Sequence, residues 1–259
     1  MRVRALVFGI VFTLAVVPAV FAQERPVWSF STAIEYSSGD YGTGQDTDVL
    51  YIPFTAGVGF DRLGLGVTIP YIRQSSQLVN ITGAGVAPRR EKRGRRNVTD
   101  DEQGLGDILA RGSYLVLRDE GALPEVRPFA KIKFPTADED LGTGEFDVTF
   151  GSDVSKTFGP LTPYAALSYT FIGEPPGADF DNTFGWTLGA AYAVTTPFSV
   201  FAQLEGATAI AAGQDNPLEL RVGFDYALTK VVKVSGSIMR GLSDGSADWG
   251  IVAGVGLRF

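Results

Sequence analysis

The end of the chain alternates strictly between two kinds of side chain. Residues 249–259, WGIVAGVGLRF, place apolar groups at every second position and mostly glycine between them. A period of two predicts a β-strand whose two faces meet different environments. Segments 125–134, 183–194 and 218–228 repeat the pattern, with charged residues, glycine, threonine or alanine prominent on the second face. We therefore expect a chain built from amphipathic strands.

The alternation extends along the chain, and the links between the strands differ in length. Tight turns such as Asp61-Arg62 and Gly159-Pro160 alternate with longer loops rich in glycine and aspartate, and 119–124 is of intermediate length. Outer-membrane β-barrels are threaded in this way, with short periplasmic turns and longer external loops. The predicted strands are 26–36, 48–60, 63–73, 104–118, 125–134, 146–158, 161–172, 183–194, 197–206, 217–228, 230–240 and 248–259.

The two faces of these strands suit lipid outside and a polar lumen inside. A soluble secreted β-sandwich or a lipocalin-like barrel is the alternative, and its core would have to come from the glycine-rich face. The sequence thus predicts an all-β fold, a transmembrane antiparallel up-and-down β-barrel of about 12 strands. Aromatic residues near the strand ends fit girdles at the two membrane interfaces, namely Trp28, Tyr36, Tyr71, Trp186, Tyr192, Trp249 and Phe259.

The N-terminus has the three parts of a secretory signal peptide, predicted to be cleaved after Ala22. After a short basic head, the apolar run at 5–17 is shorter than the roughly 20 residues that a membrane-spanning helix needs. The expected mature chain, 23–259, is one barrel in the bacterial cell outer membrane. Its final Phe259 resembles the signal that directs such proteins to the barrel-assembly machinery.

Composition excludes several classes of function. Histidine and cysteine are both absent, which removes Ser-His-Asp hydrolysis, histidine general bases, thiolate nucleophiles, and zinc sites built on either residue. The acidic loop residues Asp138, Glu139, Asp140 and Glu145 lack the spacing of a dedicated calcium loop. We expect no catalytic residue, no metal site and no cofactor. The formal net charge of −7 also gives no basic footprint for nucleic acid.

One basic run stands out against this acidic background. It lies in 74–103, which we expect to be a long external loop. Three interpretations are open: a solvated loop, a contact with outer-membrane lipid and lipopolysaccharide, whose phosphates suit arginine, or a fold-back into the pore. The basic residues are Arg89, Arg90, Lys92, Arg93, Arg95 and Arg96.

Charged residues on the second face are candidates for the lining of the pore. Either they form structural ion pairs across strands, or they set solute selectivity. Arg127, Lys131 and Lys133 form a basic ladder on one strand and are the residues that would favour carboxylate solutes. The full set is Asp107, Arg111, Arg127, Lys131, Lys133, Asp147, Asp153, Glu205, Glu219, Arg221, Asp225, Lys233, Arg240 and Arg258.

Two stretches go beyond general barrel features. GLGDI at 104–108 and KFPTADEDLGTGEFDVTFGSDVSKTFGP at 133–160 resemble the outer-membrane family named for the MetA-pathway of phenol degradation. The resemblance implies a barrel that passes small, often aromatic or apolar, compounds across the outer membrane, and it does not carry over the identity of the solute. The alternative function is a plugged structural or surface-interaction barrel without transport.

Overall fold

The computed structural model describes residues 25–42, 44–75, 79–82, 85–88, 101–138 and 141–259. Two short strands, β4 (Val79–Thr82) and β5 (Gly85–Pro88), pair as a separate hairpin. Thirteen others form one antiparallel sheet. They are β1 (Val27–Gly39), β2 (Thr47–Gly59), β3 (Leu63–Gln74), β6 (Glu102–Leu105), β7 (Leu109–Tyr114), β8 (Glu125–Lys133), β9 (Asp147–Ser155), β10 (Leu161–Phe171), β11 (Thr183–Thr195), β12 (Phe198–Ala207), β13 (Leu218–Ala227), β14 (Val232–Gly241) and β15 (Trp249–Arg258).

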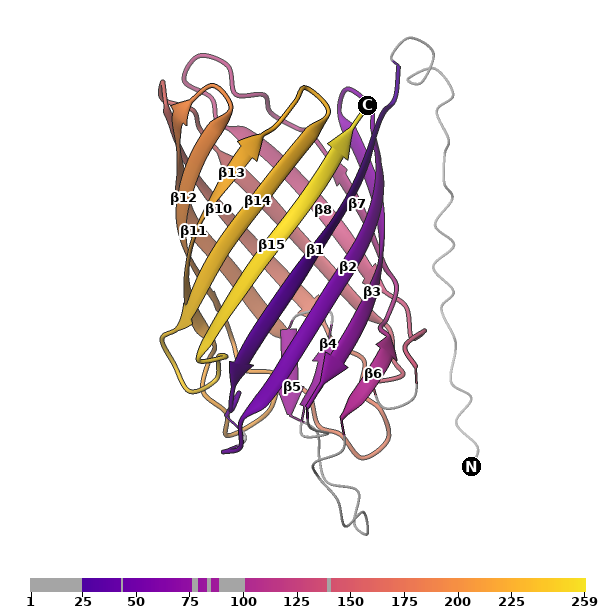
Figure 1. Cartoon of the computed structure of the whole chain (residues 1–259). Coiled ribbons are helices and arrows are strands. Elements are labelled where there is room, and N and C mark those ends of the chain that lie inside the picture. The colour runs from indigo at the N-terminus through magenta and orange to yellow at the C-terminus, as the bar shows by residue number, and fades with distance from the viewer. Residues whose placement is uncertain (1–24, 43, 76–78, 83–84, 89–100, 139–140) are drawn as a thin grey trace, which may run out of the picture.

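The sheet closes on itself because neighbouring strands pair in chain order and β15 pairs back with β1. β6 and β7 lie end to end along β3 and take one place in the wall, so the barrel has twelve strands. Short turns gather at one end and the long loops at the other (Figure 1). The predicted twelve-strand antiparallel up-and-down barrel is confirmed. No described residue belongs to a helix long and apolar enough to span a membrane.

The prediction of one continuous strand over 104–118 is wrong, because the strand is interrupted and ends earlier. Residues 106–108 separate β6 from β7, which ends at Tyr114. The register along β3 shifts by one residue between the two pairings, so the break is a bulge. Pro70 lies on β3 at this point and has no N–H to donate, and its carbonyl accepts a hydrogen bond from Gly106 N at 2.8 Å. Asp107 therefore lies in the break and not within a strand.

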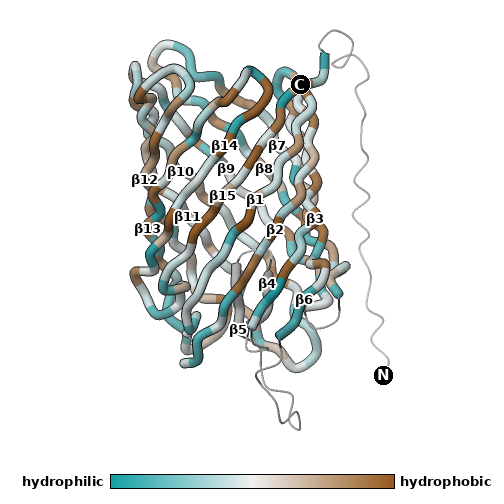
Figure 2. Tube along the Cα trace, in the orientation of Figure 1, coloured by the Kyte–Doolittle hydropathy of each residue, from teal (hydrophilic) through white to brown (hydrophobic). Residues whose placement is uncertain are grey.

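The outward face of the wall carries a belt of exposed apolar side chains. Ile34, Phe54, Leu167, Leu188 and Ile238, from five different strands, are each more than half exposed. Apolar residues lie along the strands, whereas hydrophilic stretches gather in the loops (Figure 2). An apolar outer band around a closed barrel is what a hydrocarbon environment requires.

Aromatic residues lie toward both ends of this belt. Trp28 and the C-terminal Phe259 are exposed at the short-turn end, where their backbones exchange hydrogen bonds. At the long-loop end the rings of Tyr36 and Trp249 pack against each other with centroids 5.4 Å apart. This placement matches the two interfacial girdles of membrane barrels.

Candidate functional site

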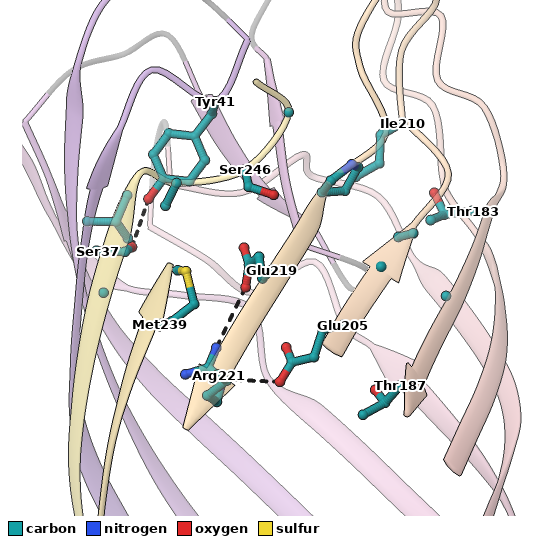
Figure 3. A pocket seen from close by; sticks show the side chains of 18 of the residues that line it. Ser37, Tyr41, Thr183, Thr187, Glu205, Ile210, Glu219, Arg221, Met239 and Ser246 are labelled. Atoms are coloured by element: carbon teal, nitrogen blue, oxygen red, sulfur yellow. Dashed lines mark hydrogen bonds and ion pairs between the residues drawn. The ribbon is translucent and has the colours of Figure 1, made fainter. Parts of the chain in front are cut away.

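The lumen holds a cavity of about 570 Å³ at the long-loop end. Inward side chains of β1, β2 and β11 to β15 supply much of its wall, and long loops supply the rest. Thr187, Glu205, Glu219 and Arg221 project into the space from β11, β12 and β13 (Figure 3). The candidate site is therefore the lumen itself.

A charged cluster occupies the β12–β13 side of this cavity. The Arg221 guanidinium lies 3.1 Å from Glu205 Oε1 and 3.7 Å from Glu219 Oε2. Gln203 donates a hydrogen bond to Glu205 and accepts one from the Tyr164 hydroxyl at 2.5 Å. The network holds two carboxylates around one guanidinium and fixes their positions on the wall.

A second cavity of about 400 Å³ lies on the β14–β15–β1 side of the lumen, toward the short turns. Its lining includes the small residues Ser31, Ala33 and Gly254. Asp225 and Lys233 also line it and pair at 2.9 Å. The small side chains leave space along this side of the barrel.

Long loops narrow the mouth of the first cavity. Tyr41, from the β1–β2 loop, turns inward and shares a hydrogen bond of 2.7 Å with Ser37. Burial raises the pKa of the Tyr41 hydroxyl to about 12, so the phenol remains protonated at neutral pH. The Tyr41 carbonyl accepts a hydrogen bond from Gln214 of the β12–β13 loop. Two loops on different parts of the rim are thereby joined across the opening.

Lys133 is enclosed rather than open to the lumen. Its side chain is 2% exposed, and its ammonium group lies 2.7 Å from Asp107 and 3.4 Å from Asp147, which are 5% and 1% exposed. The same ammonium donates to Thr143 Oγ1 at 3.0 Å and to the Glu145 carbonyl at 2.9 Å. We call Asp107, Lys133, Thr143 and Asp147 the buried cluster. Such a fully paired group is a structural element of the wall.

The buried cluster also explains the two sequence stretches that carried the family resemblance. Asp107, in the bulge, accepts hydrogen bonds from the backbone N–H groups of Thr136 and Ala137, both at 2.9 Å. Asp138 in turn accepts from Leu105 N at 2.7 Å. A side chain at Gly142 would lie 2.8 Å from the Asp107 carboxylate. The stretches fold onto each other and fasten the β8–β9 loop to β6.

The remaining charges of the β7–β9 wall lie close to opposite charges. Arg111 pairs with Asp153 at 2.6 Å and covers the ring of Phe129 at 4.0 Å. Arg127 pairs with Glu125 at 3.2 Å. Lys131 lines the first cavity, and its electrostatic environment includes Arg111 and Asp147. Arg127 and Lys133 are therefore paired with carboxylates rather than part of a free basic strip, and the effect of the ladder on solutes stays a prediction.

The prediction of lumen-lining residues from the sequence was wrong at Arg240 and left out Glu35. Arg240 was expected to face inward, but it pairs in register with Leu220 and Trp249, whose side chains face outward. It lies at the loop end of β14, where an arginine can reach the polar interface. Glu35 was not selected, although it lines both cavities. Counting alternate outward positions from Trp28 to Tyr36 leaves Glu35 on the inward face.

Some expectations fall outside the structure. The signal peptide 1–22 and the basic run 89–96 lie outside the described residues. Within the described ranges, no group of three or more acidic side chains is arranged to hold a metal ion.

A closed twelve-strand wall with an apolar outer face and a polar, cavity-bearing lumen defines an outer-membrane-type β-barrel. The chain belongs to the family described as "Putative MetA-pathway of phenol degradation", whose model matches residues 47–259. No curated protein sequence matches it.

Solved structures share this fold. The COG4313 outer membrane channel from Pseudomonas putida F1 is 14% identical, with a TM-score of 0.68 over 93% of this chain and 98% of that chain. The NanC porin is 10% identical, with a TM-score of 0.57 over 89% and 100%. The β domain of the Bordetella autotransporter BrkA is 14% identical, with a TM-score of 0.53 over 92% and 100%. At these identities the likeness establishes the barrel fold.

Proposed function

We propose that the protein is a passive channel of the bacterial outer membrane for small hydrophobic or aromatic compounds. The observation that carries the proposal is the pair of cavities inside a closed barrel, about 570 and 400 Å³ in volume. Cavities of this size accommodate small organic molecules. The family description, which refers to phenol degradation, supports an aromatic solute class.

The chemistry of the lumen supports passage rather than reaction. The chain has neither histidine nor cysteine, so the common general base and thiolate nucleophile are missing. We therefore propose that the protein is not an enzyme. The carboxylates of the lumen lie beside basic groups, as expected for a selective lining.

The long loops face the cell exterior in this proposal, and the short turns face the periplasm. The basic loop residues 89–96 then meet the phosphate groups of lipopolysaccharide, and Phe259 reaches the barrel-assembly machinery. Replacing the five arginines of the loop by glutamine tests the first contact. Loss of membrane integrity with unchanged solute flux would assign the run to the surface and not to the pore.

Solute flux into liposomes tests the proposed channel. Phenol, benzoate and a sugar of similar size are compared in liposomes with and without the refolded protein. We expect phenol to enter faster than it enters protein-free liposomes, by a larger factor than the sugar. No difference from protein-free liposomes for any solute would favour the plugged structural barrel.

The lumen charges call for a separate variant. Arg127→Gln with Lys131→Gln neutralises the part of the basic ladder that is not enclosed, and benzoate flux should fall while phenol flux is unchanged. Lys133 is kept because its replacement disturbs the buried cluster. An Arg118→Gln variant, which removes one positive charge at the exposed turns, is the control and should leave both fluxes unchanged.

A further inference from the structure

The two cavities lie next to each other in the lumen and share part of their lining. Of the residues that the structure describes, only Glu35 and Val252 line both of them. These residues face each other in the β1–β15 register, and Glu35 also lies opposite Tyr51 of β2. The side chain of Glu35 therefore lies where the two cavities adjoin.

Further charges surround this junction. Glu35 interacts electrostatically with Arg221 and with Glu205, which project from β13 and β12. Glu205 and Glu219 pair with the Arg221 guanidinium, and Glu35 adds a third carboxylate within reach of its charge.

The other charged residues of the lining leave more acidic than basic groups around the two cavities. Among the described residues, the two cavities together are lined by the acidic residues Glu35, Glu205, Asp215, Glu219 and Asp225, and by the basic residues Lys131, Arg221 and Lys233. Lys233 is paired with Asp225. An excess of negative charge in a confined space attracts cations and repels anions.

We propose that Glu35, together with Glu205 and Glu219 around Arg221, forms a charge-selective junction that favours cations over anions in the lumen. The inference rests on the proposed channel function and adds its charge preference. Neutral aromatic solutes pass the junction without penalty, whereas small anions are slowed there. Arg221 holds the carboxylates in place without neutralising all of them.

Ion selectivity in planar bilayers tests the junction. The reversal potential in a KCl gradient gives the ratio of K⁺ to Cl⁻ permeability. We expect a ratio above one for the wild type and a decrease of about fourfold for Glu35→Gln. One unit charge about 10 Å from a monovalent ion in water changes the permeability of K⁺ and of Cl⁻ by about twofold each, in opposite directions. Glu219→Gln provides an independent second decrease. Glu174→Gln, an exposed loop residue that lines neither cavity, removes the same charge and should leave the ratio unchanged.

The outcomes separate this inference from the proposed function. Heat-modifiable gel mobility first establishes that each variant is folded. A wild-type ratio of one or less would overturn the junction, as would a Glu35→Gln change no larger than that of Glu174→Gln. Phenol flux in liposomes from the same preparation judges the channel separately. Phenol flux without any ionic current would reject a water-filled junction and leave the channel in place, and loss of both would reject both.

Discussion

Replacing Lys133 by methionine should strongly destabilise the barrel. Methionine keeps the length and apolar stem of the side chain but removes the ammonium group, so Asp107 and Asp147 remain buried without their partner. Breaking a buried pair by removing one member costs about 3–5 kcal/mol. The Thr143 hydroxyl and the Glu145 carbonyl also lose a donor. We expect a loss of about 4 kcal/mol, within this range.

Urea unfolding in lipid vesicles measures this loss. With a slope of about 2 kcal/mol per M of urea, the midpoint for Lys133→Met should fall by about 2 M. Lys230→Met, in the exposed β13–β14 turn, is the matched control and should unfold with the wild type. Asp107→Asn should cost less in the Lys133→Met background than in the wild type. A midpoint for Lys133→Met equal to that of Lys230→Met would refute the structural role of the cluster.

Three further predictions follow from the packing and the electrostatics of the wall. Gly151→Ala should lower the free energy of unfolding by about 1–3 kcal/mol, because the added methyl group would lie 2.5 Å from the Leu167 carbonyl oxygen. A methyl group added at Gly66 would lie 3.6 Å from the nearest atom, so Gly66→Ala should be nearly neutral in the same urea assay. Leu188→Lys, on the lipid face, should cost about 2–4 kcal/mol in vesicles, whereas Thr187→Lys, opposite Glu205 on the lumen face, should fold almost as well; equal costs would contradict the assignment of the two faces. Hydrogen bonds from Lys156 and Thr157 hold the pKa of Asp119 below its ordinary value. Their stabilising effect is therefore complete above the ordinary pKa of aspartate and is lost as the pH falls through the lower pKa of the folded state. Carboxyl-carbon NMR should show that the pKa of Asp119 rises toward its ordinary value in Lys156→Met, and an unchanged pKa would remove Lys156 as the cause.

Strand alternation was enough to predict the barrel wall. β10, for example, runs from 161 to 171 where 161–172 was expected. A period of two is a local signal, and pairing in chain order requires no knowledge of distant contacts. The inward orientation of residues such as Arg221 follows from the same count. For this reason most charged residues of the lumen could be predicted from the sequence. Arg240 was assigned to the wrong face of its strand because the alternate positions of β14 were counted one residue out.

Contacts between loops could not be predicted in this way. The break at 106–108 depends on Pro70 across the sheet and on backbone donors of Thr136 and Ala137, far along the chain. Lys133 alternates like any lumen residue, yet the loop folded over it removes it from the pore. The GLGDI stretch marked the place but gave no geometry. The position of Glu35 in the lining of both cavities depends on the packed lumen and not on the alternation of β1 alone.

Blocking the lumen chemically tests the central claim most directly. The chain has no cysteine, so Thr187→Cys places a single thiol on the wall of the first cavity and Leu188→Cys places one on the lipid face. Each variant is modified with a bulky thiol reagent before reconstitution, and phenol flux into liposomes is measured. The account predicts that modification at 187 strongly reduces the flux and modification at 188 leaves it unchanged. Equal flux through both modified proteins would contradict passage through the lumen.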